Sequence, residues 1–218
     1  MQMRKALVRL IKTGGIEAVA FSSAREFLDD PFQRQVDCAV TDIMMPGFDG
    51  LKLQKEINKT LPHLSMVFIT GHGNVLMSVE AMKGGAVDFL EKPVDDKALL
   101  TAIHRAAKRS RTLKESLDEL IAIERRYERM TPRERQVFAL VTAGLLNKQI
   151  AFDLGVAERT VKVHRGRAME KMEADSLAQL VRMAQLLGVH AVAEPAGAAP
   201  MVPNEHDRPR SRRHRNAS

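Results

Sequence analysis

Cysteine is nearly absent from this sequence: Cys38 is the single one among 218 residues. One cysteine excludes a disulfide bond within the chain and favours a reducing compartment. No apolar run approaches the roughly 20 residues that a membrane-spanning helix needs, and the first residues lack the apolar core of a secretory signal. We therefore expect a soluble, cytoplasmic protein that does not associate with membranes.

Positive charge is unevenly distributed and concentrated in the second half of the chain. Residues 105–218 hold 22 lysines and arginines against 14 acidic residues, whereas residues 1–104 hold 12 against 13. Five of the arginines lie between Arg208 and Arg215. A near-neutral first half and a basic second half predict that only the second half binds a polyanion.

Short apolar segments alternate with helical patterns in the first half. The apolar runs predict strands over residues 16–21, 36–42, 66–70 and 86–90. Periodic apolar residues predict helices over residues 4–12, 24–28, 51–60 and 75–83, and from Asp95 onward. Strands separated by helices of this length pair in parallel through right-handed crossovers. The sequence therefore predicts an α/β fold.

Three of these strand segments end in, or lead directly to, a polar residue: Asp42, Thr70 and Lys92. The carboxyl ends of strands in an open parallel sheet converge on one crevice. A carboxylate, a hydroxyl and an ammonium in this crevice suit a phosphoryl group, which Asp42 would accept. Asp42 could instead bind a metal, or it could simply end its strand by bonding its own loop backbone. Both alternatives stay open.

Three motifs of the first half resemble the receiver domain of two-component response regulators. They are TDIMMPGFDG over residues 41–50, FITGHG over residues 68–73 and DFLEKP over residues 88–93. The resemblance covers residues 1–108 and implies a flavodoxin-like parallel sheet with the strand order 2-1-3-4-5.

The same resemblance assigns roles to individual residues. It implies that Asp42 is the phosphoacceptor of a partner sensor histidine kinase and that Thr70 is the switch hydroxyl. Lys92 would contact the phosphoryl group, and Phe89 matches the aromatic residue that swings inward on activation. The Lys92–Pro93 peptide bond matches a position that is cis in this family.

The first strand of the receiver pattern is missing. Receivers begin with a strand that ends in an acidic pair, and this pair holds Mg²⁺. No acidic residue lies between Met1 and Glu17, so we expect an incomplete sheet and a weak Mg²⁺ site formed by Asp42 and the carbonyl of Met44. Two explanations stay open. We favour a start codon assigned too late, and the alternative is a degenerate receiver that acts independently of phosphorylation.

A continuous helix is predicted from Asp95 to Tyr127, because this stretch contains no glycine or proline. Apolar or small residues recur there at spacings of four and three, which predicts a coiled-coil seam and a homodimer. The seam consists of Leu99, Ile103, Ala106, Ser110, Leu113, Leu117, Leu120, Glu124 and Tyr127. The alternative is an amphipathic helix packed on its own receiver and followed by a solvated linker.

The sequence TPRE over residues 131–134 predicts a sharp helix start. Thr131 can cap the helix, proline suits its first position, and Glu134 completes a capping box. Two more helices, predicted over residues 148–154 and 158–172, are separated by a tight glycine turn. This order is typical of a helix-turn-helix motif, whose second helix enters the major groove of DNA.

The helix over residues 158–172 carries a cationic face opposite an apolar one. Cations can bond guanine edges or phosphates, valine can meet a thymine methyl, and glycine permits close backbone approach. The predicted DNA contacts are Arg159, Lys162, Val163, His164, Arg165, Gly166 and Arg167. His164 could instead be a packing histidine, and both interpretations stay open.

The second half resembles the LuxR-type output domain of the FixJ/NarL group of response regulators. The matching segments are residues 131–134, 147–151, 154–156 and 158–165. The resemblance implies a fourth helix over residues 176–187 that forms a dimer contact, with double-stranded DNA as a partner and RNA polymerase as a further one. The predicted domains are a truncated receiver (1–108), a helical linker (109–130), an all-α LuxR-type helix-turn-helix domain (131–188) and a disordered basic tail (189–218).

We therefore predict a DNA-binding transcriptional regulator that is controlled by phosphorylation of Asp42 and is not an enzyme. A phosphatase built on an aspartate nucleophile is an alternative, but it needs an acid two residues further on, where this chain has Met44. A protein-binding adaptor without DNA is another alternative, and the cationic face of residues 158–172 argues against it.

Overall fold

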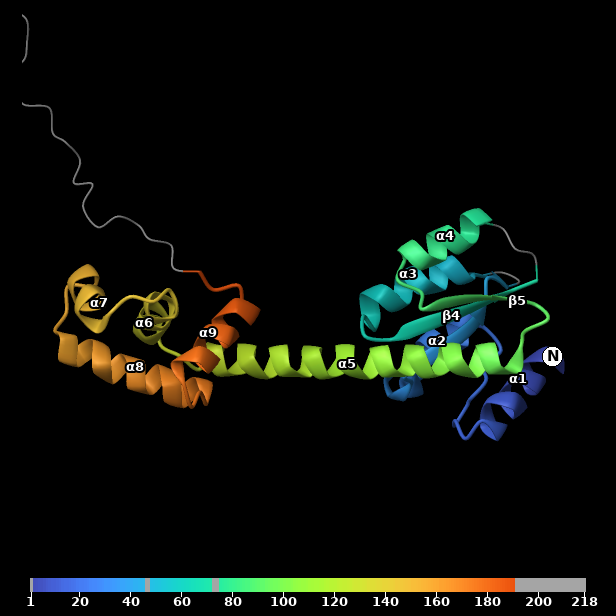
Figure 1. The fold of residues 1–218 in the computed structure, drawn as a ribbon, viewed down its shortest axis with the longest axis horizontal. Helices are drawn as coiled ribbons and strands as arrows, with labels where there is room; N and C mark the ends of the chain where they lie inside the picture. The colour runs from blue at the N-terminus through green and yellow to red at the C-terminus, as the bar shows by residue number, and fades with distance from the viewer. Residues whose placement is uncertain (1, 46–47, 72–74, 191–218) are drawn as a thin grey trace, which may run out of the picture. The chain divides into compact units, whose positions relative to one another are not determined.

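The computed structural model describes residues 2–45, 48–71 and 75–190 (Figure 1). The chain divides into two compact units, Met1–Ala122 and Ile123–Ser218. Three parts of the sequence predictions lie outside the described residues: Pro46 and Gly47, the His72–Gly73 end of the second receiver motif, and the predicted disordered tail beyond residue 190. None of the helices in the described ranges is long and apolar enough to cross a membrane.

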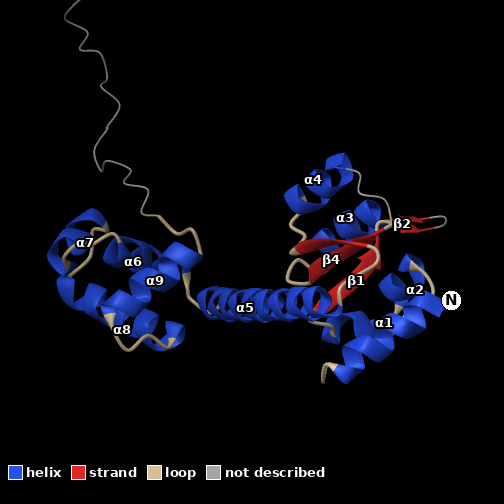
Figure 2. Ribbon diagram, turned by 45° about the vertical axis from the view of Figure 1, so that its right-hand side comes forward, coloured by secondary structure: helices blue, strands red, loops and turns tan. Residues whose placement is uncertain are grey.

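The first unit contains a parallel sheet, shown in red in Figure 2. Its described strands are β1 (Cys38–Asp42), β4 (Ser65–Thr70) and β5 (Asp88–Glu91), in the order β1-β4-β5. This arrangement confirms the predicted parallel α/β class. Among the described strands, β1 pairs only with β4 and lies at an edge, as expected for an incomplete sheet.

Helices cover both faces of this sheet. On one face, α2 (Ala24–Asp29), α3 (Gly50–Thr60) and α4 (Val75–Lys83) share a core with β4 through residues such as Phe27, Ile57 and Phe68. On the other face, α1 (Gln2–Thr13) and the first part of α5 (Asp96–Glu128) pack through Ile11 and Leu99. A short 3-10 helix, η1 (Pro31–Gln35), precedes β1.

The prediction of a strand over residues 16–21 is wrong. The segment has the alternation of a strand, because Ile16 and Ala18 pack against the core while Val19 is exposed. However, no strand among the described residues lies beside it to take its backbone hydrogen bonds. Alternating burial predicts extended backbone, but a strand also needs a partner.

The loop after Asp42 adds a feature that the sequence did not predict, a hairpin of β2 (Met44–Met45) and β3 (Phe48–Asp49).

The first part of the predicted coiled-coil seam is buried inside its own unit. Leu99, Ile103, Ala106 and Ser110 are all buried, and the Ser110 hydroxyl accepts a hydrogen bond from the backbone N–H of Ser65 at 2.8 Å. These residues are therefore not available to a second helix, and a seam over the whole stretch is wrong. The alternative prediction, an amphipathic helix on its own receiver, describes this part of α5.

The described residues of the second unit form helices and connecting turns, without a strand. This unit contains α6 (Pro132–Thr142), α7 (Asn147–Asp153), α8 (Glu158–Met172) and α9 (Leu177–Leu186). Their core includes Phe138, Ile150, Val161 and Leu180, and Ile123, Tyr127 and Met130 join it from the end of α5 and the turn after it. The capping box of Thr131 and Glu134 at the start of α6 is confirmed.

Candidate phosphoacceptor site and nucleic-acid interface

Asp42 ends β1 and has two partners. Its Oδ2 atom lies 2.5 Å from Nζ of Lys92, and its Oδ1 atom accepts a hydrogen bond from the backbone N–H of Met44 at 3.0 Å. The Asp42 side chain remains 32% exposed and the Lys92 side chain 24% exposed. The carboxylate therefore bonds its own loop, as a strand-ending aspartate does, and still lies beside a cation and solvent.

The sheet register brings the other two predicted residues to the same end. Thr70 ends β4 and is buried, and the backbone N–H of Lys92 donates to the carbonyl of Thr70 at 2.8 Å. The Lys92–Pro93 peptide bond is cis, as the resemblance implies. Phe89 lies in β5 and is partly buried against the core. Asp42, Thr70 and Lys92 thus lie at the same end of the parallel sheet.

The chemistry of this crevice suits the transfer of a phosphoryl group to a carboxylate. The Asp42 carboxylate is accessible and could act as the nucleophile, and the Lys92 ammonium beside it could bind the oxygens of an incoming phosphoryl group. Cys38, at the opposite end of β1, is excluded as the nucleophile. Burial, with a smaller effect of Asp37, raises the pKa of its thiol to about 12, so the thiol stays protonated at neutral pH.

The described residues fit a Mg²⁺ ion poorly. Mg²⁺ needs octahedral oxygen ligands and usually takes its charge partners from carboxylates. No group of three or more His, Cys, Asp or Glu side chains that could hold a metal occurs in the described part of the chain. Asp42 is already paired with Lys92, the Met44 carbonyl carries no charge, and Asp49 caps the N-terminus of α3.

The predicted recognition helix, α8, presents its cationic face to solvent. Val161, Ala168 and Met172 are buried and attach the helix to the core, as predicted. His164 and Arg165 are partly exposed, and the exposed members of the predicted DNA-contact set are Arg159, Lys162, Val163, Gly166 and Arg167. A methyl group added at Gly166 would meet no atom within 4 Å, so the helix surface is open there.

Several contacts fix this face in the free protein. The Asn147 side-chain oxygen in α7 accepts a hydrogen bond from Arg165 at 3.3 Å, and Glu158 pairs with Lys162 at 3.5 Å. The ring Nδ1 atom of His164 is buried without a hydrogen-bond partner, so one side of this histidine faces the protein. Asn147 begins the matching segment 147–151, but only the fold shows that it lies beside Arg165.

Arg133 is a further residue that the sequence did not single out. Its guanidinium donates a hydrogen bond to the carbonyl of Leu154 at 3.0 Å, next to the turn between α7 and α8. This contact joins the start of α6 to the helix-turn-helix motif.

An α/β unit with aspartate, threonine and lysine at its strand ends, followed by a helix-turn-helix unit, defines a response regulator with a DNA-binding output domain. Residues 1–104 match the family model "Response regulator receiver domain". Residues 128–184 match "Bacterial regulatory proteins, luxR family".

Individual relatives span both units. The chain is 46% identical to Nodulation protein W of Bradyrhizobium diazoefficiens, over 88% of this chain and 84% of that protein. It is 44% identical to the transcriptional regulatory protein FixJ of Azorhizobium caulinodans, over 86% of this chain and 89% of that protein. A solved structure of the response regulator StyR, 39% identical, superposes with a TM-score of 0.74 and covers 85% of this chain and 93% of its own.

The chain belongs to the FixJ-type response regulators with a LuxR-type output domain. It is a DNA-binding transcriptional regulator of a two-component system, and its family is one of regulators rather than enzymes.

Proposed function

We propose that Asp42 is the residue that receives the phosphoryl group from a sensor histidine kinase. The distance of 2.5 Å between Asp42 Oδ2 and Lys92 Nζ supports this role, because the same ammonium would pair with a phosphoryl oxygen after transfer. Thr70 would act as the switch hydroxyl and Phe89 as the aromatic residue that responds to it. Because the regulator acts on DNA, we place it in the cytoplasm.

The test is the intact mass of the 218-residue chain after incubation with acetyl phosphate, with and without Mg²⁺. We expect slow labelling by one phosphoryl group with weak dependence on Mg²⁺, because the described residues contain no group of three or more side chains that could hold the ion. Asp42→Asn should remain unlabelled. Equal labelling of Asp42→Asn would refute the assignment of the acceptor, and rapid Mg²⁺-dependent labelling of the wild type would refute our assessment of the metal site.

A regulator that works independently of phosphorylation is the second candidate. The poor fit of the described residues to Mg²⁺ favours it. If the wild-type chain stays unlabelled with a histidine kinase as well as with acetyl phosphate, this second candidate replaces the first.

We propose that α8 reads DNA in the major groove. The observation that carries this proposal is the exposed cationic face of α8, opposite the buried residues Val161, Ala168 and Met172. Lys162 and Arg165 would contact bases or phosphates.

The test is the affinity for a duplex that the wild-type chain selects from a random library. Lys162→Ala and Arg165→Ala should each weaken binding by about 1–3 kcal/mol if the lost contact is to a base. Lys114→Ala is the matched control, since it removes one exposed cation from α5 in the first unit. Equal affinity of the wild type and the double variant would refute the proposal.

We further propose a homodimer on DNA. Exposed apolar residues support it: α9 exposes Leu177 and Leu186, and α4 exposes Val75 and Leu76, the last two at 73% and 79%. RNA polymerase would then be a partner of the DNA-bound dimer.

A further inference from the structure

Glu173 has an unusual backbone conformation. It follows the last residue of α8 with φ 53° and ψ 42°, and it is the one described non-glycine residue with a positive φ. Glycine or asparagine normally occupies this position after a helix, because a Cβ atom is unfavourable in the left-handed region. Glutamate at this position therefore costs free energy that glycine would avoid.

The Glu173 side chain contacts the end of α5. Its Oε2 atom lies 2.6 Å from Nη2 of Arg126, and its Oε1 atom lies 3.4 Å from Nη2 of Arg129. Arg126 belongs to the last two turns of α5, and Arg129 directly follows this helix. One carboxylate at the C-terminal end of α8 thus holds two cations at the end of α5.

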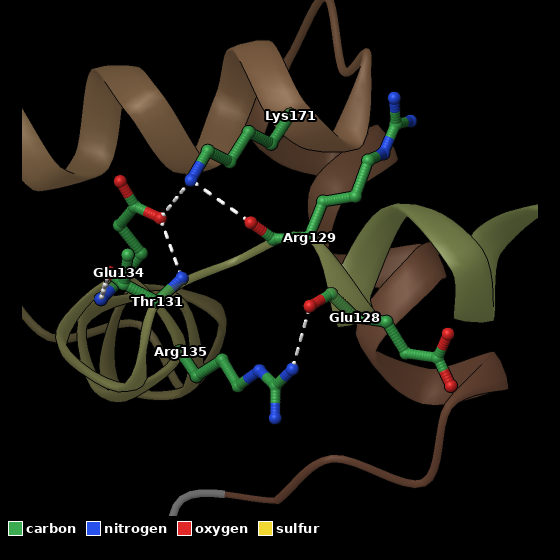
Figure 3. Close-up of polar contacts among 6 residues, drawn as sticks. All are labelled: Glu128, Arg129, Thr131, Glu134, Arg135 and Lys171. Carbon is green, nitrogen blue, oxygen red and sulfur yellow. Dashed lines mark hydrogen bonds and ion pairs between the residues drawn. The ribbon is translucent and has the colours of Figure 1, made fainter.

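Lys171 makes a second connection between the C-terminal end of α8 and the segment that follows α5 (Figure 3). Its ammonium donates to the carbonyl of Arg129 at 3.0 Å and to the carboxylate of Glu134 at 2.6 Å. The same Glu134 oxygen accepts the backbone N–H of Thr131 at 2.8 Å. The C-terminal end of α8 is therefore fixed to the turn between α5 and α6 by two neighbouring side chains.

Stability alone does not account for Glu173. Its carboxylate is 56% exposed, and exposed ion pairs contribute little to the free energy of unfolding. The ion pairs therefore offset the unfavourable backbone conformation only in part. The buried residues Val161, Ala168 and Met172 attach α8 to the core. The two ion pairs add a connection from its C-terminal end to the end of α5.

We propose that Glu173, Arg126 and Arg129 are positioning residues of the recognition helix, so that the end of α5 is part of the DNA-reading module. This inference rests on the proposed function of α8. In the free protein the ion pairs hold α8 in the orientation that binds DNA. Without them the binding-competent orientation is populated less, and the apparent affinity falls by the same factor.

Simple electrostatics predicts the opposite effect of replacing Glu173, an increase in DNA affinity. Glu173 is an acid on the helix that faces a polyanion, so its removal should strengthen DNA binding if charge alone mattered. Glu170 is a matched control, because it is an exposed acid near the same end of α8. The two residues therefore separate positioning from net charge.

The experiment measures two quantities on the full 218-residue chain. One is the affinity for a 30-base-pair duplex that the wild type selects from a random library. The other is the urea midpoint of the second unit, followed by Tyr127 fluorescence. Tyr127 is a specific probe, since the sequence has one tyrosine and no tryptophan and Tyr127 packs in the second unit.

We expect Glu173→Gly to keep or raise the urea midpoint and to weaken DNA binding about three- to tenfold, the range that two exposed ion pairs can supply. Glu173→Gln should also weaken binding, whereas Glu170→Gln should bind as tightly as the wild type or more tightly. The charge exchange Glu173→Arg with Arg126→Glu should recover part of the affinity lost in Glu173→Gly.

Two results would overturn the inference. One is a Glu173→Gly variant that binds as tightly as the wild type, and the other is a loss of affinity that the charge exchange does not reverse at all. Lys162→Ala and Arg165→Ala distinguish the failure of this inference from the failure of the proposed function. If they weaken binding and Glu173→Gly does not, only the positioning role is wrong, and if none of them has an effect, α8 does not read DNA.

Discussion

The Asp42 carboxylate divides its two oxygens between two partners, the backbone N–H of Met44 and the ammonium of Lys92. The first contact fixes the direction of the side chain, and the second places a cation where negative charge would increase on phosphorylation. The sequence predicts that Asp42 and Lys92 converge, and it leaves the bond to the loop backbone as an open alternative. An aspartate at a strand end commonly bonds its own loop, and strand ends of a parallel sheet converge.

Glu134 and Lys171 form a second residue-scale feature, and it makes the second unit sensitive to acid. Burial raises the pKa of the Glu134 carboxyl, but hydrogen bonds from Lys171 and Thr131 outweigh burial, and the pKa lies below its ordinary value. A carboxyl whose pKa is lowered by folding stabilises the protein above its unfolded pKa. This contribution is lost as the pH falls through the lower, folded pKa.

We predict that Glu134→Gln lowers the free energy of unfolding of the second unit by about 1–3 kcal/mol at pH 7, because a buried charged hydrogen bond is lost. The difference from the wild type should shrink as the pH falls below the ordinary range of glutamate, because the wild-type carboxyl becomes protonated as the pH passes its lowered, folded pKa. Urea unfolding followed by Tyr127 fluorescence at several pH values measures both effects, with Glu170→Gln as the control. A difference that is constant from pH 7 to pH 3 would contradict the role of ionised Glu134.

At the scale of elements, α5 shows how far a sequence pattern can be interpreted. Its spacing of four and three correctly predicts the buried face from Leu99 to Ser110, but the pattern does not identify the surface that covers it. Near the end of the helix the pattern fails, because Ile123 is buried whereas Glu124, a member of the predicted seam, is exposed. The sheet covers the face from Leu99 to Ser110, and the second core covers Ile123 and Tyr127. Ser110 interrupts the apolar pattern because its hydroxyl accepts the N–H of Ser65, a contact that depends on the fold.

Ser110→Ala tests that contact. Without the hydroxyl, the N–H of Ser65 at the start of β4 is buried without a partner, so the variant should destabilise the first unit by about 1–3 kcal/mol. Labelling of Cys38 against urea concentration reports on this unit, since the single cysteine is partly buried in its core. Ser116→Ala is the matched control because Ser116 is exposed on the same helix. An equal effect of the two substitutions would contradict the importance of the Ser65 contact.

Two further features of the structure could not be predicted from the sequence. The segment over residues 16–21 has the alternation of a strand but no neighbouring strand among the described residues, and pairing depends on the fold rather than on the local pattern. Glu173 is a non-glycine residue in a left-handed conformation, which no local rule predicts. Its arginine partners are distant in the sequence, so the network around it becomes visible only in the folded unit.

At the scale of the whole molecule, dimer formation predicts a symmetric footprint on DNA. Two copies related by a two-fold axis would protect two half-sites about one helical turn apart. Leu177→Lys together with Leu186→Lys in α9 should weaken the joint protection more than the binding of a single half-site. Footprinting combined with sedimentation measures both, and a single protected half-site with only monomer on DNA would contradict the dimer.

The central claim is that phosphorylation of Asp42 in the first unit controls DNA binding by the second unit. The DNA affinity of phosphorylated and unphosphorylated protein tests this claim most directly. Wild type and Asp42→Asn are each incubated with a phosphodonor, the phosphorylated fraction is read from the intact mass, and affinity for the selected duplex is measured at a fixed salt concentration. The account predicts that affinity rises with the phosphorylated fraction of the wild type and that Asp42→Asn does not respond. An unchanged affinity in a wild-type preparation that carries the phosphoryl group, or an equal response of Asp42→Asn, would contradict it.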